Sequence, residues 1–392
     1  AAFAAGGVDD ILARVPDAIA RAIPRSPRRS GPGPLGSRFE HWHSLRLVPR
    51  GLSSAGVVLT RLLLGEAPEG AVAAHLGASL AALPKKDGGV RPIACGSVLR
   101  RLAARGVCSA FHDELRTAAG PLQFAVGRPA GGEVVQDCLT CLSEARPSAA
   151  FLSVDFQNAY NTLGRASILE AVGKRCPELL PVARTFCRGS TRHYWPGAAG
   201  DDAAPVDAAR GVDQGCPLSP ALYAIGTAPA LEELLARLRA LDPDAAVMAY
   251  LDDTYVVVAQ EHAGRALTLV GELFGPRGLK LNLTKTKVWV PNGNTDNLDI
   301  DLEDLVTSHL PCLGSSITFV AAALDDVYDA RMQPFQKARE SLDNFTAELQ
   351  FLVENGLQLK YAIVLHTTYV NGATTHLLRT QYVDVEFCTA WD

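Results

Sequence analysis

Two adjacent carboxylates stand in the most informative stretch of the chain, residues 248–258. An apolar run ends at Tyr250, and a β-branched run follows Asp252 and Asp253. This pattern predicts two strands joined by a tight turn that carries the aspartates. Adjacent carboxylates repel unless they are solvated or a cation lies between them. Mg²⁺ binds one or two carboxylates together with substrate phosphates. Alone, however, an Asp-Asp pair is more typical of a solvated turn.

A third acid, Asp155, ends a short apolar stretch at residues 151–154. An acid at the end of a buried strand is a frequent site position in folds that mix helices and strands. Capping of the following turn explains Asp155 equally well. Further on, alternation over residues 280–290 predicts an extended segment with Lys285 and Lys287 on one face.

Cations and a tight backbone turn provide two further candidate elements. Residues 83–93 predict a hairpin around Asp-Gly-Gly that projects Lys85, Lys86 and Arg91, which suits a triphosphate. An exposed basic hairpin without a ligand is the simpler interpretation of that stretch alone. Gln214-Gly215 precedes a predicted helix, and the glycine allows the backbone to approach a ligand closely.

The composition narrows the class of protein. The chain has 392 residues, is 48% hydrophobic and carries a net charge of −5, which predicts a globular protein. The charge argues against a nucleic-acid coat protein, so any nucleic acid must meet a local basic patch. Nine scattered cysteines predict free thiols and a reducing compartment. No apolar run is long enough for a membrane span, so no membrane partner is expected.

The apolar periodicity predicts mixed helices and strands. We expect a partly flexible Pro/Gly/Arg-rich leader at 1–50, a body at 51–320 and a helical region at 321–392. One amphipathic helix is predicted over residues 99–115, and Pro229 is expected to kink a helix that follows Ser219-Pro220.

In this order and spacing, the motifs resemble the reverse transcriptase family, most closely its non-LTR retrotransposon type, over residues 83–315. The resemblance implies an α+β, right-hand polymerase fold with fingers and palm at 51–320 and a helical thumb from 321. It also implies RNA-directed DNA polymerase activity, a nucleotidyl transfer that joins dNTPs to a primer 3′-hydroxyl.

The resemblance assigns roles residue by residue. Asp155, Asp252 and Asp253 would hold two Mg²⁺ ions, or Mn²⁺, with the Phe156 carbonyl nearby. Tyr160 would exclude a ribose 2′-hydroxyl. The remaining assignments are substrate contacts by Lys85, Lys86, Arg91, Gln214, Gly215 and Tyr250, a catalytic Lys285 near the leaving pyrophosphate, and a primer grip at Leu313-Gly314.

In the implied reaction one ion lowers the pKa of the primer hydroxyl and the other neutralises the leaving pyrophosphate. The implied partners are an RNA template, a DNA primer and dNTPs, and the oligomeric state is left open. Free thiols and the resemblance together suggest an intracellular, nuclear location.

Two other interpretations compete with this one. A viral RNA-dependent RNA polymerase is disfavoured by Tyr160 and by Leu251 before the paired aspartates. A catalytically silent fragment that binds RNA or protein is favoured by abrupt ends at Ala1 and Asp392, but the intact acids argue against it. Maturases and telomerases share the fold and would need further RNA-binding regions. No endonuclease, RNase H or zinc-knuckle motif is seen, so retrotransposition by this chain alone is not expected.

Overall fold

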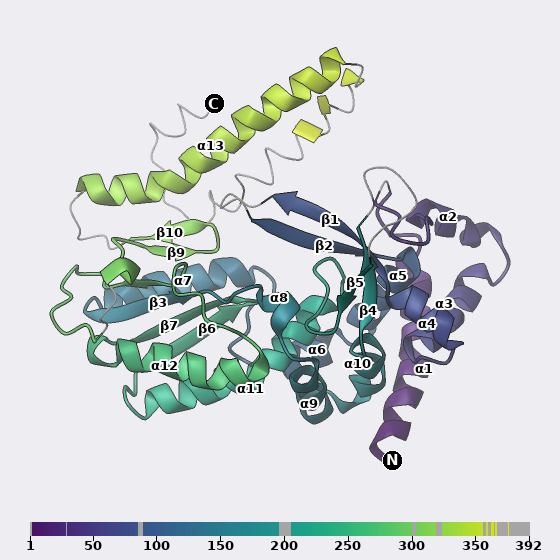
Figure 1. Ribbon diagram of the computed structural model, residues 1–392, viewed down its shortest axis with the longest axis horizontal. Helices are drawn as coiled ribbons and strands as arrows, with labels where there is room; N and C mark the ends of the chain where they lie inside the picture. Colours follow the sequence, from purple (N-terminus) through teal and green to yellow (C-terminus); the bar gives the residue numbers. More distant parts are fainter. Residues whose placement is uncertain are drawn as a thin grey trace. The chain divides into compact units, whose positions relative to one another are not determined.

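A computed structural model describes residues 2–28, 30–84, 89–195, 205–299, 303–318 and 324–355, together with 358, 359, 362, 363, 365, 366 and 375. The chain divides into two compact units (Figure 1). The first comprises Ala1–Arg128, Phe156–Glu233 and Gly271–Lys280. The second comprises Pro129–Asp155, Leu234–Val270 and Leu281–Asp392.

The first unit contains a four-stranded sheet in the order β2-β1-β4-β5. Strands β1 (Ala78–Pro84) and β2 (Val90–Gly96) form the predicted hairpin, with Pro84 paired to Val90. Strand β4 (Thr191–Tyr194) lies parallel to β1 and antiparallel to β5 (Pro205–Ala208). The hairpin is therefore confirmed, while Lys85 and Lys86 lie outside the described residues.

The helices of the first unit include a packed N-terminal helix. Helix α1 (Ala2–Ala22) buries Ile11, Val15 and Ile19 completely and packs on α3 (Gly51–Leu63) and α5 (Val98–Ala110). The expected leader at 1–50 thus contains a packed helix, with turns and two short helices after it. The others are α2 (Phe39–His43), η1 (Ser44–Leu47), α4 (Glu69–Leu76), α6 (His112–Ala119), α8 (Ala159–Thr162), α9 (Arg165–Arg175), η2 (Pro177–Leu179), α10 (Leu180–Phe186) and η4 (Gly275–Arg277).

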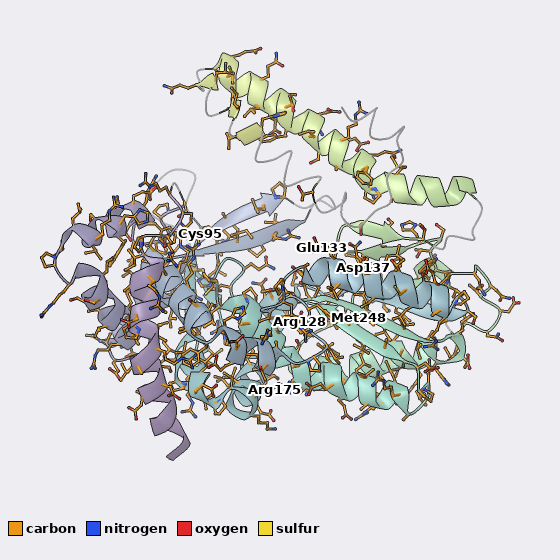
Figure 2. All side chains as sticks on the ribbon, turned by 180° about the vertical axis from the view of Figure 1, so that it is seen from behind. Cys95, Arg128, Glu133, Asp137, Arg175 and Met248 are labelled. Carbon is orange, nitrogen blue, oxygen red and sulfur yellow. The ribbon has the colours of Figure 1, made fainter. Side chains whose placement is uncertain are left out.

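The predicted single helix over 99–115 is wrong in one respect. The backbone leaves the helical region at Phe111 (φ −119°, ψ 32°), so α5 ends there and α6 begins. Phe111 is fully buried, and packing at this corner outweighs the continuous periodicity of the sequence. In the same unit Arg175 on α9, labelled in Figure 2, donates to both Glu232 carboxylate oxygens at 2.9 and 2.7 Å.

The second unit is built on an antiparallel sheet in the order β6-β7-β3-β8. Its strands are β3 (Ala149–Val154), β6 (Ala246–Tyr250), β7 (Asp253–Ala259) and β8 (Lys287–Trp289). Phe151 and Trp289 pack in the core with ring centroids 5.4 Å apart. Because the middle of β7 is buried on both faces, the run Val256-Val257-Val258 is apolar throughout instead of alternating.

Helix α7 (Gly131–Ala145) contacts β6 and the small hairpin of β9 (Leu310–Cys312) and β10 (Ser315–Ile317) (Figure 1). Helix α13 (Leu324–Glu354) contacts β10, and η3 (Gln260–His262) and η5 (Glu303–Leu305) complete the unit. Two helices belong to both units by sequence, α11 (Ser219–Arg239) and α12 (Ala263–Phe274). Helix α11 begins at Ser219 and continues through Pro229.

The eight cysteines within the described residues are free thiols, as predicted. Among the described helices, none combines the length and apolarity that crossing a membrane requires.

Candidate active site

The paired aspartates lie at the tip of the β6–β7 hairpin. Tyr250 pairs with Asp253, which leaves Leu251 and Asp252 as a two-residue loop. Leu251 has φ +57°, a backbone region that L-residues with side chains rarely adopt. Two-residue hairpin loops require positive φ at the first position because their backbone must follow the twist of the strands. The tight turn predicted from the sequence is confirmed.

Strand pairing brings the third acid to the same end of the sheet. Strand β3 pairs with β7 so that Val154 lies opposite Thr254. In an antiparallel pair the next residue of one strand lies level with the preceding residue of the other, so Asp155 comes level with Asp253. Three carboxylates therefore lie near one another at the same end of the sheet: Asp155 directly after β3, Asp252 in the loop and Asp253 at the start of β7.

The electrostatics of this edge favour a cation. Desolvation, followed by the negative charges of Asp252 and Asp155, raises the pKa of Asp253 to about 7. The residue as a whole is exposed, so solvent screens part of this repulsion and its free-energy consequence is smaller than the shift alone suggests. A carboxyl group that resists ionisation beside two others would ionise readily once a divalent cation neutralised the cluster.

The three aspartate side chains at this end of the sheet offer only oxygen donors to a metal ion. Within the described parts of the chain, no three His, Cys, Asp or Glu side chains form a ready-made metal cage. Mg²⁺ does not need such a cage, since it keeps several waters and binds substrate phosphates besides one or two carboxylates. The oxygen-only donors and the raised pKa of Asp253 fit a hard divalent cation.

The loop after Leu281 orients Asp155. Asn282 Nδ2 donates to Asp155 Oδ2 at 2.7 Å, and the Asn282 backbone N–H donates to the Asp155 carbonyl at 2.9 Å. Thr286 Oγ1 accepts from the Asp155 N–H at 3.3 Å and donates to the Asn282 carbonyl at 2.9 Å. The carboxylate that follows β3 is thereby held by a second segment.

Here one expectation is wrong. Residues 280–290 do not form one extended segment, because the N–H groups of Lys285 and Thr286 both donate to the Asn282 carbonyl and close a turn. Only Lys287–Trp289 is strand, so Lys285 is an exposed residue of the turn and Lys287 a half-buried residue of β8. Asn282 had no predicted role of its own, although asparagine is a residue type that favours turns.

A second support lies beneath the aspartates. Tyr255 of β7 is buried, and its hydroxyl accepts from the Leu313 N–H at 3.1 Å at the β9–β10 turn. Burial and the nearby Cys312 and Asp253 raise the pKa of the Tyr255 hydroxyl, so it stays neutral. The resemblance suggested a primer grip at Leu313-Gly314, where φ is +49° and +86°. Tyr255 was not foreseen, because it reads as one more residue of a buried strand.

The other predicted site residues belong to the first unit. Tyr160 stacks on Tyr223, with ring centroids 4.8 Å apart and planes 5° from parallel. Phe156 packs on Phe274 with centroids 5.0 Å apart. Arg91 is exposed on β2, opposite Leu83.

Gln214 and Gly215 also lie in the first unit, against strand β2. The Gln214 carbonyl accepts from the Ala94 N–H at 2.7 Å. Gly215 has φ +119°, which favours glycine. Gln214 Oε1 is buried and has no hydrogen-bond partner within the described residues, so it is an acceptor that a ligand could satisfy.

Comparison with known proteins gives matches in curated sequences and in solved structures. Over 218 residues, 55% of this chain, it is 30% identical to the retrotransposable element SLACS 132 kDa protein of Trypanosoma brucei gambiense. The match covers 18% of that protein. The chain therefore corresponds to less than a fifth of this relative.

Two solved structures are similar at 12% identity. Telomerase from Candida albicans, solved in complex with a TWJ fragment of telomeric RNA, matches 80% of this chain and 62% of that chain with a TM-score of 0.49. Apo telomerase from Candida tropicalis truncated from the C-terminal domain matches 64% and 54% with a TM-score of 0.45.

A family model of the reverse transcriptase (RNA-dependent DNA polymerase) matches residues 83–317, which is more than half of the chain. The predicted α+β class is visible in the helices and in the sheets, whose strand pairs are antiparallel except for β1 with β4. The curated relative is a retrotransposable element protein, in line with the predicted retrotransposon type. The chain thus belongs to the reverse transcriptase family, whose members are RNA-directed nucleotidyltransferases.

Proposed function

We propose that this chain is an RNA-directed DNA polymerase that joins dNTPs to a primer 3′-hydroxyl on an RNA template. One observation carries the proposal: the sheet register aligns Asp155 with Asp253 beside Asp252, and desolvation together with these two charges raises the pKa of Asp253 to about 7. A cluster of this kind is suited to cation-assisted phosphoryl transfer, in which positioning and electrostatics provide most of the rate.

Two Mg²⁺ ions, or Mn²⁺, would supply a lowered pKa at the primer hydroxyl and charge neutralisation at the leaving pyrophosphate. Asp155, Asp252 and Asp253 would hold them, together with the Phe156 carbonyl. The contacts of Asn282 keep the Asp155 carboxylate in one orientation, so little reorganisation is needed when substrate arrives.

The remaining roles are part of the same proposal. Lys285 is exposed and would approach the leaving pyrophosphate, while Arg91, Lys85 and Lys86 would bind the triphosphate. Tyr160 would exclude a ribose 2′-hydroxyl, and stacking on Tyr223 would keep its ring from turning away. Gln214, Gly215 and Tyr250 would contact the nascent base pair. An intracellular, nuclear place of action completes the proposal.

Primer extension on an RNA template with dNTPs and Mg²⁺ tests the function. Asp252→Asn is nearly isosteric but removes one charge, so incorporation should fall by at least about 10²–10³-fold. Asp296→Asn is the matched control, because Asp296 is an exposed acid in a loop of the same unit. EDTA should abolish extension by the wild type. A folded wild-type chain that extends no primer would favour the silent, RNA- or protein-binding fragment instead.

The proposed exclusion of ribonucleotides by Tyr160, here called the gate, needs a separate test. Tyr160→Ala should admit ribonucleotides and lower the ratio of dNTP to rNTP kcat/KM, whereas Tyr194→Ala, at a more exposed tyrosine of the same unit, should not. An unchanged ratio in Tyr160→Ala would refute the gate.

A further inference from the structure

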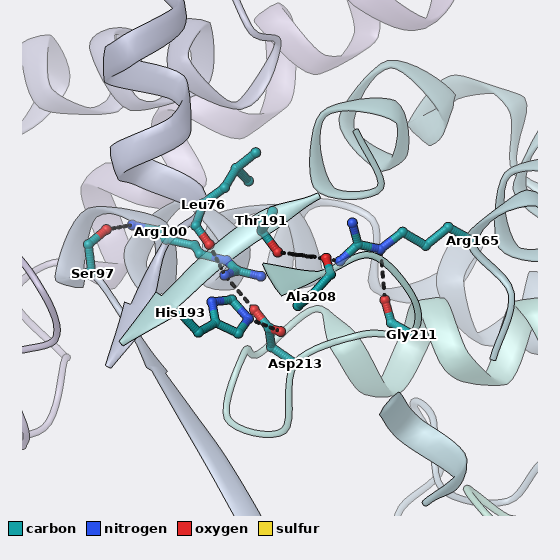
Figure 3. A network of polar contacts seen from close by, with 9 residues as sticks. All are labelled: Leu76, Ser97, Arg100, Arg165, Thr191, His193, Ala208, Gly211 and Asp213. Carbon is teal, nitrogen blue, oxygen red and sulfur yellow. Dashed lines mark hydrogen bonds and ion pairs between the residues drawn. The ribbon is translucent and has the colours of Figure 1, made fainter. Parts of the chain in front are cut away.

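We propose that Asp213 is a positioning residue that fixes the Gln214-Gly215 loop on strand β2 and thereby sets the affinity for dNTPs. The inference rests on the proposed function and adds a residue to which no role was assigned. Asp213 is buried, with 7% of its surface exposed. Its Oδ2 accepts from Arg100 Nη1 at 2.6 Å, and its Oδ1 lies 2.8 Å from His193 Nε2 (Figure 3).

Both partners lie next to or within the four-stranded sheet of the first unit. Arg100 lies in the first turn of α5, directly after β2, and its Nη1 also donates to the carbonyl of Leu76, two residues before β1. His193 lies in β4, opposite Ala78 at the start of β1. The Asp213 carboxylate therefore connects the Gln214-Gly215 loop to the β1–β2 hairpin. Its contacts reach the hairpin where β1 begins and just after β2 ends (Figure 3).

Gln214 and Gly215, which follow Asp213, contact strand β2 directly. The Gln214 carbonyl accepts from the Ala94 N–H at 2.7 Å, three residues from Arg91. A Cβ on Gly215 would lie 2.8 Å from the Ala94 carbonyl oxygen, so loop and strand are in close contact. Gln214 Oε1 is buried and has no hydrogen-bond partner within the described residues. A shift of the backbone that Asp213 holds would therefore move this acceptor as well.

A buried ion pair is by itself weak support for stability, because desolvation offsets much of the attraction. Its best-attested benefit is a fixed geometry, and here the geometry concerns the spacing between Gln214 and Arg91. A shift of about 1 Å in a positioning group costs up to about 10²-fold in rate or binding. The network therefore predicts a selective effect on dNTP affinity.

Arg100→Lys tests this inference, because lysine keeps the charge but its side chain is shorter. Its ammonium nitrogen ends about one bond short of the Nη1 position that donates to both Asp213 and Leu76. The KM for dNTP should rise about tenfold with kcat changed less than about threefold. The matched control is Arg146→Lys, since Arg146 Nη2 binds the buried Asp242 at 2.8 Å in the second unit, and its KM should stay unchanged. If Arg100→Lys does not fold, His193→Ala leaves the Arg100 pair intact and should raise KM about threefold.

Amide exchange at Ala94 provides a readout that needs no activity. Exchange should accelerate in Arg100→Lys and not in Arg146→Lys. Unchanged Ala94 exchange, or an equal KM shift in both variants, would overturn the inference. If the wild type is active and the KM for dNTP is unchanged in both Arg100→Lys and His193→Ala, the inference is wrong while the proposed function stands. If the wild type is folded but incorporates no dNTP, both the proposed function and this kinetic role are wrong.

Discussion

At the scale of single residues, the site depends on a carboxylate held by an amide. Asp155 is the third acid of the cluster, and Asn282 contacts it twice, through Nδ2 at 2.7 Å and through its backbone N–H. Groups behind a metal ligand orient it, and their loss typically reduces activity or metal affinity by about 10–100-fold. Asn282 is therefore expected to matter although it bears no charge.

Replacing Asn282 by alanine should lower kcat/KM for dNTP by about 10–100-fold without unfolding the protein. Asn282→Asp should be worse, because a fourth negative charge would lie beside Asp155. Asn297→Ala, at an exposed position in the same unit, serves as the control. Steady-state primer extension and circular dichroism measure activity and fold. Equal activities of Asn282→Ala and Asn297→Ala would contradict the orienting role.

The raised pKa of Asp253 predicts a pH-dependent affinity for metal. Below about pH 7 its carboxyl group is protonated in the metal-free protein, and a cation must displace that proton. Apparent Mn²⁺ affinity should therefore rise about tenfold from pH 6 to pH 8. Titration calorimetry measures it, with Asp253→Asn as the variant that loses the dependence. A flat profile in the wild type would show that Asp253 is ionised throughout.

At the scale of elements, backbone positions decide where the side chains lie. Gly211 has φ +64°, its N–H donates to the Leu163 carbonyl at 2.8 Å, and a Cβ there would collide with the Tyr160 carbonyl oxygen. The Val212 N–H also donates to that carbonyl at 2.8 Å. Because Gly211 has no Cβ, the loop at residues 211–212 can approach Tyr160 closely and hold its backbone in place.

Gly211→Ala should destabilise the protein by at least about 2 kcal/mol, from backbone strain and the collision with Tyr160. It should also lower discrimination between dNTP and rNTP, because Tyr160 must shift. Gly275→Ala is the control, since nothing lies within 4 Å of a Cβ there. Urea unfolding and competing incorporation are the measurements. Loss of stability with unchanged discrimination would separate Gly211 from the gate.

Sequence patterns predicted those elements in which the local residue preferences and the tertiary packing favour the same structure. Asp-Gly-Gly marked the β1–β2 hairpin, and the acidic pair between apolar runs marked β6–β7. The break at Phe111 and the turn at Lys285 were missed, because burial and a bond to the Asn282 carbonyl decide them. Asn282, Tyr255 and Asp213 act through partners distant in sequence, which no local pattern reveals.

At the scale of the whole molecule, two buried or crowded groups make stability depend on pH in opposite directions. His75 is 2% exposed, and burial together with Arg100 lowers its pKa to about 3. Its unfolded form, with pKa near 6.5, binds a proton that the folded form does not, so stability falls as pH drops below 6.5. Asp253 has the opposite sign, because its raised pKa favours folding below about 4 and loses that effect as pH rises through 7.

The two groups lie in different units, His75 in the first and Asp253 in the second. Between pH 7.5 and 5.5, His75 should reduce the free energy of unfolding of its unit by about 1.4 kcal/mol. Asp253 should make the second unit more stable over the same range in the absence of metal. His75→Leu should remove the acid loss, whereas His112→Leu, at an exposed histidine, should not. Urea unfolding at both pH values, followed by amide exchange in each unit, measures the two effects separately. Both ring nitrogens of His75 are buried and have no hydrogen-bond partner within the described residues, so nothing there stabilises its protonated form. Unchanged stability of the first unit at pH 5.5 would contradict this prediction.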